Sequence, residues 1–194
     1  KPVDEIVADE KVSTFAISAG AAAFKVNCVQ CHGSGAAGSP GYPNLNDDEW
    51  LWGGKAEDIL TTISHGIRFA SDDATRFSEM PAFADVLDKD QTAQVASYVV
   101  SLSGTPQNPS LVEAGKALFA ENCAACHGED AKELRDFGAP NLTDAIWLRG
   151  SGEAAIAAQI AAPKHGIMPA WAGRLGEATV KELTVYVHSL GGGE

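Results

Sequence analysis

The sequence predicts an all-α protein built from two similar domains, and three observations lead to this prediction. Apolar residues recur at helical spacing in three segments of each half of the chain. No segment alternates apolar and polar residues for long enough to predict a sheet. Widely separated sequence features also occur twice in the same order, which indicates a duplicated unit.

The expected helices follow from these apolar patterns and from the Ala-rich stretches that contain them. We expect them at residues 14–31, 55–65, 90–102, 111–126, 152–161 and 177–190. The polar start of the chain and a Pro-containing stretch in its middle are expected to be linkers. The predicted organisation is a linker at 1–12, a domain at 13–104, a linker at 105–109 and a second domain at 110–194.

Composition and charge narrow the classes of partner. Of the 194 residues, 45% are hydrophobic and 21% charged, and no run of 18 apolar residues could cross a bilayer, so the chain is expected to be water-soluble. The formal net charge of -12 argues against nucleic acid and anionic membrane surfaces as partners, because these bind clustered Lys and Arg. A basic protein partner fits better, and the alternative is that the acidity serves only solubility.

The repeat is defined by matched motifs in the two halves. Each half has Ala-Gly, Phe and Asn-Cys-x-x-Cys-His-Gly, then Pro-Asn-Leu, Trp-Leu, Met-Pro-Ala, and finally Tyr-Val and Ser-Leu. The first half has the longer stretch between its internal histidine, His65, and its methionine, Met80. Insertions of this kind are typical of loops in a duplicated domain.

The cysteines carry the chemistry of each half. All four belong to two Cys-x-x-Cys-His motifs, Cys28 with Cys31 and Cys123 with Cys126. In a helical turn these positions share a face, so two thiols can form thioethers with a porphyrin while His32 or His127 becomes the proximal iron ligand. The alternatives are a zinc site spanning both halves or a redox dithiol, and the latter lacks its usual strand-helix-strand context.

The two methionines of the chain, Met80 and Met168, both precede proline at equivalent positions. Proline disfavours helix in the residue before it, so both should lie on extended segments and act as sixth iron ligands. His65 and His165 are rival ligands, of which His65 is the more serious. Either Pro43 or Pro140 could accept a hydrogen bond from the proximal histidine of its half, or could simply shape a turn.

Two arginines, Arg68 and Arg149, are candidates for charge-assisted contacts to haem propionates. The tryptophans are expected to pack around the haems rather than to relay electrons. With His and Met on the two faces of each iron, no coordination position is open, so electron transfer is favoured over ligand activation.

The Cys-x-x-Cys-His and Met-Pro-Ala motifs resemble those of class I cytochromes c. The ordered set over essentially all of the chain resembles the dihaem subunit III, of CcoP or FixP type, of cbb3-type haem-copper oxidases. The supporting segments include Pro-Asn-Leu-Asn-Asp-Asp-Glu-Trp-Leu-Trp-Gly-Gly, His-Gly-Ile-Arg, Gly-Ala-Pro-Asn-Leu-Thr-Asp and Tyr-Val-His-Ser-Leu-Gly-Gly-Gly-Glu.

This resemblance implies two class I cytochrome c domains, each wrapped around one covalent haem c. It assigns Cys28, Cys31, His32 and Met80 to the first haem, and it assigns Cys123, Cys126, His127 and Met168 to the second. It also implies a position on the periplasmic side of the bacterial inner membrane, through an N-terminal anchor that this chain lacks. Electrons would come from a donor cytochrome c and pass to the monohaem and catalytic subunits, with no catalytic site in this chain.

Three other functions stay open at this point. A free periplasmic electron shuttle resembling cytochrome c4 would need no membrane complex. A dihaem peroxidase would need a displaceable ligand at one haem, which two methionine ligands argue against. In a docking module, the haems would mainly hold the fold together.

Overall fold

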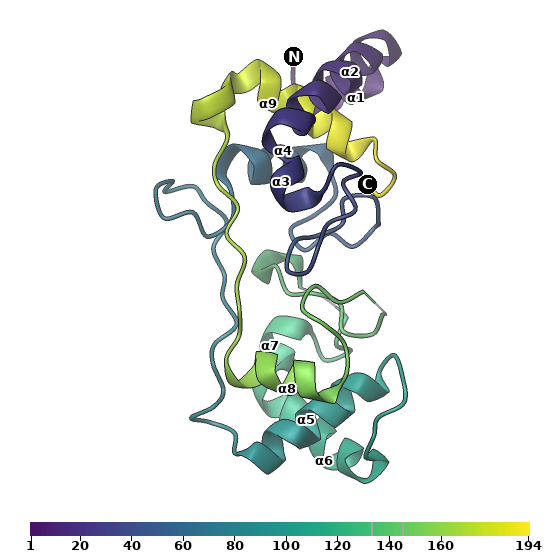
Figure 1. Cartoon of the computed structure of the whole chain (residues 1–194), viewed down its shortest axis with the longest axis vertical. Helices are drawn as coiled ribbons and strands as arrows, with labels where there is room; N and C mark the ends of the chain where they lie inside the picture. Colours follow the sequence, from purple (N-terminus) through teal and green to yellow (C-terminus); the bar gives the residue numbers. More distant parts are fainter. Residues whose placement is uncertain (133, 145) are drawn as a thin grey trace. The chain divides into compact units, whose positions relative to one another are not determined.

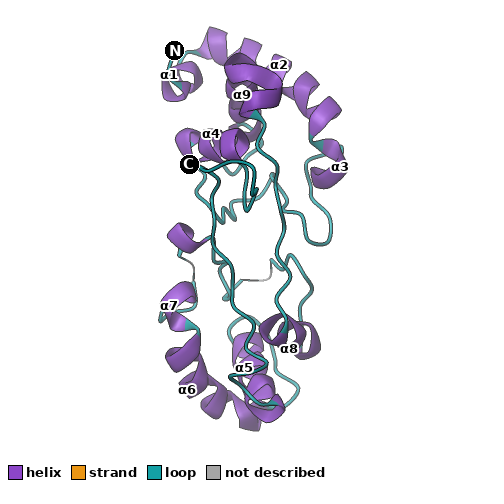
Figure 2. Cartoon of the chain, turned by 90° about the vertical axis from the view of Figure 1, so that its left-hand side faces the viewer, coloured by secondary structure: helices purple, strands orange, loops and turns teal. Residues whose placement is uncertain are grey.

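The computed structural model describes residues 1–132, 134–144 and 146–194 of the chain. These residues form helices joined by loops, with only isolated β-bridges between extended segments (Figures 1 and 2). The helices are α1 (Val3–Ala8), α2 (Glu10–Asn27), α3 (Val29–His32), α4 (Ala56–His65), α5 (Lys89–Ser101), α6 (Val112–Asn122), α7 (Ala124–His127), α8 (Glu153–Ala161) and α9 (Ala172–His188). Two short 3-10 turns, η1 (Pro109–Leu111) and η2 (Arg135–Phe137), complete the set. None of the helices described is both long and apolar enough to span a bilayer.

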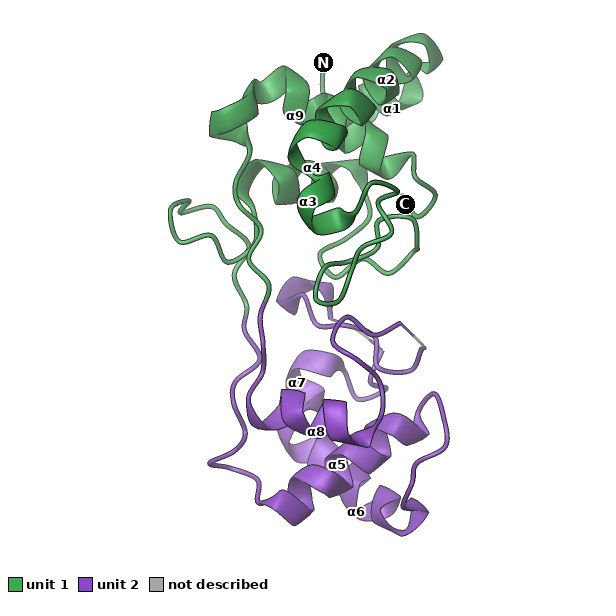
Figure 3. Ribbon diagram, in the orientation of Figure 1, with its two compact units in different colours: residues 1–78, 166–194 green, residues 79–165 purple. Residues whose placement is uncertain are grey.

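Residues from both sequence repeats contribute to each of the two compact units of the fold. Unit 1 contains residues 1–78 and 166–194, and unit 2 contains residues 79–165 (Figure 3). In unit 1, α9 packs against α2 and α4, while in unit 2, α5 packs against α6 and α8. The last helix of each repeat therefore packs on the first helix of the other repeat, so the compact units differ from the domains 13–104 and 110–194 expected from sequence.

A glycine makes each of these helix crossings possible. A Cβ atom at Gly20 of α2 would overlap the main chain of Glu182 in α9, and one at Gly115 of α6 would overlap the main chain of Gln94 in α5. These are the glycines of the repeated Ala-Gly motif. The motif therefore marks a point of close approach between α2 and α9 in unit 1 and between α5 and α6 in unit 2.

Adding a methyl group at this point should destabilise the unit. We expect Gly20→Ala to lower the free energy of unfolding by about 1–3 kcal/mol, the usual cost of overpacking a well-packed contact. Gly173→Ala is the matched control, because a Cβ at Gly173 in the first turn of α9 meets no atom within 4 Å. Urea unfolding of the haem-loaded protein measures both, and equal stabilities for the two variants would argue against this role of Gly20.

The start of the chain is helical and packed, unlike the linker expected at residues 1–12. In α1, Val3 is buried and forms a small core with Ala16 of α2, Ala56 of α4 and Val185 of α9. The side chain of Asp9 accepts a hydrogen bond from Val12 N at 3.3 Å and so caps α2. Burial of apolar side chains thus holds this segment against unit 1.

Residues 105–109, expected to link two domains, instead join α5 to α6 within unit 2. Glu153 at the start of α8 holds this connection, because its carboxylate accepts hydrogen bonds from Gln107 N at 2.8 Å and from the buried Ser97 hydroxyl at 2.9 Å. The chain passes between the two units at residues 78–79 and 165–166.

Candidate haem sites

The first Cys-x-x-Cys-His motif lies at the end of α2, where the chain turns into the single helical turn α3. Cys28 ends α2, with its N–H bonded to Phe24 O at 2.9 Å, and His32 N bonds to Cys28 O at 3.0 Å. This local winding places Cys28, Cys31 and His32 at helical spacing, as the sequence predicts. Gly33 then ends the turn with φ of +77°, a conformation that strongly favours glycine.

The imidazole of His32 is oriented by Pro43. The Nδ1–H group donates to Pro43 O at 3.1 Å, which leaves Nε2 with a lone pair available for a metal. Burial lowers the pKa of His32, and the Pro43 hydrogen bond opposes part of this shift. A neutral imidazole with a fixed tautomer is the form that ligates iron.

The thiol of Cys28 lies in an apolar setting. Burial raises the pKa of Cys28 to about 11, with a smaller contribution from the neighbouring Cys31, and the same causes raise the pKa of Cys123 to about 11 beside Cys126. Both thiols are therefore protonated and neutral at pH 7. Apolar surroundings suit a thiol that ends as a thioether better than one that must act as a thiolate.

A cavity opens beside these residues in unit 1. Its empty space of about 810 Å³ includes a part that is open to solvent. Its lining is mainly apolar and includes aromatic residues from three parts of the chain. Among the lining residues are Phe24, Cys28, His32, Trp52, Met168 and Trp171.

The methionine in this cavity is Met168, which comes from the second sequence repeat. Met168 lines the same space as Cys28 and His32, whereas Met80 packs against the core of unit 2. The structure therefore brings Met168 of the second repeat, and not Met80 as the resemblance implies, into the cavity beside the first Cys-x-x-Cys-His motif. The physical reason is the exchange of last helices between the repeats, because each methionine precedes the helix that has crossed.

In unit 2, the second Cys-x-x-Cys-His motif lies where α6 ends and α7 begins, with Cys123, Cys126 and His127 at the same helical spacing. His127 Nδ1–H donates to Pro140 O at 3.4 Å, and burial lowers the pKa of His127 with a smaller opposing effect from this hydrogen bond. Met80 packs on a cluster that includes Cys123 and Phe119. His165 Nε2–H donates to Met80 O at 3.2 Å, so His165 supports the methionine segment from outside the cluster.

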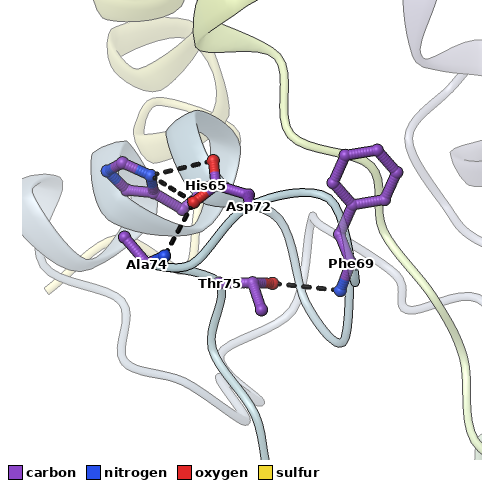
Figure 4. Close-up of polar contacts among 5 residues, drawn as sticks. All are labelled: His65, Phe69, Asp72, Ala74 and Thr75. Atoms are coloured by element: carbon purple, nitrogen blue, oxygen red, sulfur yellow. Dashed lines mark hydrogen bonds and ion pairs between the residues drawn. The ribbon is translucent and has the colours of Figure 1, made fainter.

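His65, the rival sixth ligand for the first site, makes a different contact. Its Nδ1–H donates to the carboxylate of Asp72 at 3.1–3.2 Å, and the same carboxylate accepts from Ala74 N at 2.8 Å (Figure 4). His65 is not among the residues that line the described cavity. The structure therefore uses His65 to hold the loop that follows α4.

The two arginines expected at the propionates, Arg68 and Arg149, have the following surroundings in the structure. Arg68 donates to two main-chain carbonyls, Gly166 O and Ser78 O, each at 2.7 Å. Arg149 is half-buried in the turn before α8. Arg76, which the sequence did not single out, donates to Trp52 O at 3.0 Å, stacks 5.8 Å from the Trp52 ring centroid, and has a buried Nε with no partner.

Comparisons with known proteins show the family to which the chain is related. A family model described as cytochrome c matches residues 17–103, and one described as cytochrome c oxidase, cbb3-type, subunit III matches residues 110–187. The cbb3-type cytochrome c oxidase subunit FixPc of Rhizobium leguminosarum bv. viciae is 64% identical over 193 residues, covering 100% of the chain and 67% of the relative.

Two further relatives also match nearly the whole chain. FixP of Rhizobium meliloti is 62% identical, covering 99% of the chain and 66% of the relative. CcoP of Cereibacter sphaeroides is 55% identical, covering 97% of the chain and 66% of the relative. The chain thus spans about two thirds of the length of these relatives.

Proposed function

Because the chain belongs to the FixP/CcoP family of cbb3-type cytochrome c oxidase subunits, we propose that it binds two haems c and relays electrons into the oxidase. The source is a donor cytochrome c, and the recipients are the monohaem and catalytic subunits of the complex. We assign the reduction of oxygen to those subunits. The position proposed for this chain is the periplasmic side of the bacterial inner membrane.

The residues of unit 1 fit a covalent haem. The cavity places a proximal histidine, a neighbouring cysteine and a methionine around one apolar space, and this is the donor set of a His-Met cytochrome c. Arg76 adds a buried Nε without a partner beside Trp52, which lines the cavity. We propose Arg76, in place of Arg68, as the group that meets a haem carboxylate in this unit.

The proposed ligand sets are crossed between the repeats. Cys28, Cys31, His32 and Met168 serve the first haem, and Cys123, Cys126, His127 and Met80 serve the second. Each haem would supply one-electron redox chemistry, and a methionine ligand would raise its reduction potential. Pro43 and Pro140 would fix the tautomer of the proximal histidines through the hydrogen bonds that their carbonyl groups accept.

The observation that carries this proposal is the meeting of Met168 with Cys28 and His32 in one apolar cavity. A free shuttle resembling cytochrome c4 would use similar haem sites, so the haems alone do not distinguish the two functions. The family membership favours the oxidase.

Electron entry into the purified, haem-loaded chain tests the proposal. We expect a pyridine haemochrome assay to give two c haems per chain, and stopped-flow mixing with a reduced basic cytochrome c to reduce both. The rate should fall steeply with added salt, because the net charge of -12 attracts a basic donor at low ionic strength. One haem per chain, or a rate indifferent to salt, would contradict this account of the chain and its donor.

Transfer onward is measured in the assembled complex. Oxygen consumption by the oxidase containing this subunit should require both haems here, and reduced chain alone should consume oxygen far more slowly. A free shuttle would instead restore respiration when added as a soluble protein to an oxidase lacking this subunit.

A further inference from the structure

The main chain of Met168 makes two hydrogen bonds with Ile67, the residue that follows Gly66. Ile67 N donates to Met168 O at 2.9 Å, and Met168 N donates to Ile67 O at 3.0 Å. This pair of bonds forms an isolated antiparallel bridge inside unit 1. Both main-chain polar groups of Met168 are thereby satisfied, so the residue has a defined position even though it lies in a loop.

Gly66 allows this close approach. Its φ is +70°, and a Cβ atom there would overlap Met168 O and lie 2.8 Å from the carbonyl carbon of Pro169. Glycine is needed both for the conformation and for the space. The end of α4 is thus shaped to receive the methionine segment.

Arg68 adds a further contact to the segment that contains Met168. Its Nε–H donates to Gly166 O and its NH1 donates to Ser78 O, each at 2.7 Å, so one guanidinium joins the segment before Met168 to the segment that leaves unit 1. Arg68 also has φ of +51°, which is uncommon for a residue other than glycine and costs energy unless the surroundings compensate. Its own N–H is bonded to Arg76 O at 2.8 Å.

Arg68 lies at the point where the sequences of the two repeats diverge. The tripeptide His-Gly-Ile occurs at residues 65–67 and again at 165–167, where Met168 follows directly. In the first repeat, Arg68 follows instead and begins an insertion that returns to Met80. Only the first repeat has this insertion, and in the structure its first residue contacts the methionine segment of the second repeat.

We propose that Arg68 is a positioning residue for the axial methionine of the first haem, which it serves by clamping Gly166 two residues before Met168. This inference rests on the proposed function, because it requires that Met168 ligates the iron. Partners outside the ligand shell commonly fix the geometry of metal ligands in this way. Arg68 is not among the residues that line the described cavity, and it acts through Met168.

Arg68→Ala in the haem-loaded full chain tests this clamp, by which we mean the hydrogen bond from Arg68 to Gly166 O. Loosening the segment increases the fraction of molecules in which methionine has left the iron, so imidazole should bind the first ferric haem about tenfold more tightly. The methionine-to-iron charge-transfer absorption of that haem should weaken in parallel. The haem concerned is identified as the one whose charge-transfer absorption is lost in Met168→Ala.

Two further variants separate positioning from general stability. Arg68→Lys keeps the charge but loses the planar fork that reaches two carbonyls, so it should resemble Arg68→Ala; full recovery with Lys would overturn the clamp. Asp72→Ala is the matched control, since it removes hydrogen bonds to His65 and Ala74 in the same loop without touching residues 166–168. An equal gain in imidazole affinity in Asp72→Ala would likewise overturn the clamp.

The Met168→Ala variant distinguishes a failure of the proposed ligand set from a failure of the proposed role of Arg68. If it leaves the charge-transfer absorption of both haems intact, the proposed ligand set fails, and the role of Arg68 fails with it. If Met168→Ala abolishes the absorption of one haem while Arg68→Ala changes neither the absorption nor imidazole binding, only the clamp is refuted.

Discussion

Replacing Met168 by alanine is expected to remove methionine ligation from the haem held by Cys28 and Cys31, although Met168 belongs to the other sequence repeat. The reason is geometric, because Met168 lines the cavity that contains Cys28 and His32. Loss of the thioether should lower the reduction potential of this haem on the order of 0.1 V, a fraction of the ~0.8 V over which axial ligands set haem potentials.

Proton NMR of the reduced protein identifies the haem that changes. A ligated methionine has a methyl resonance shifted strongly by the porphyrin ring, and nuclear Overhauser effects connect it through the haem to the attached cysteines. In Met168→Ala, the lost methyl resonance should be the one connected to Cys28 and Cys31. Met80→Ala is the matched variant and should remove the resonance connected to Cys123 and Cys126. The reverse assignment would show that each methionine serves its own repeat.

The features that the sequence predicts correctly are local. The Cys-x-x-Cys-His turns at His32 and His127 depend on residues three and four positions apart, so their geometry follows from helical spacing. Contacts of these histidines with Pro43 O and Pro140 O are one of the two possibilities that the sequence offers, and the structure has both contacts. The predicted all-α class with two cytochrome c domains is confirmed by the family models and the helices.

The crossed pairing could not be predicted from the repeat, because the repeat itself is nearly symmetric. Val95, Tyr98 and Val99 of α5 match Leu183, Tyr186 and Val187 of α9. Either helix therefore offers a similar apolar face to either Ala-Gly site, at Gly20 or Gly115. The crossing is a property of the long-range packing, which local motifs do not encode.

The packed start of the chain was missed for a different reason. Val3, Ile6 and Val7 have the i, i+3, i+4 spacing of an apolar helix face, and Asp9 is a good N-cap for the helix that follows. The surrounding charges obscured this short pattern. The role of Arg68 depends on carbonyl groups from distant segments, so its partners could not be identified from sequence.

Removing haem attachment from unit 1 is expected to unfold residues 1–78 together with 166–194, while residues 79–165 stay folded. In the variant Cys28→Ala, Cys31→Ala, the space for the haem is left unfilled. A dry void of about 200 Å³ would cost about 5 kcal/mol at ~24 cal/mol per Å³. This is comparable to the whole stability of a small domain.

Limited proteolysis with mass spectrometry can map the surviving fragment. Because α5 packs against α6 and α8, the expected protected fragment begins near residue 79 and ends near 165. If the repeats folded as independent domains, the protected fragment would instead run from about residue 110 towards the end of the chain.

The converse variant, Cys123→Ala, Cys126→Ala, supplies the matched control. It should expose residues 79–165 and leave two protected pieces, 1–78 and 166–194, which remain associated through the packing of α9 on α2 and α4. Two fragments that stay together after cleavage are a result that independent repeats cannot produce. The exchange of helices thus makes each haem stabilise residues from both halves of the sequence, so loss of either haem removes structure in both repeats.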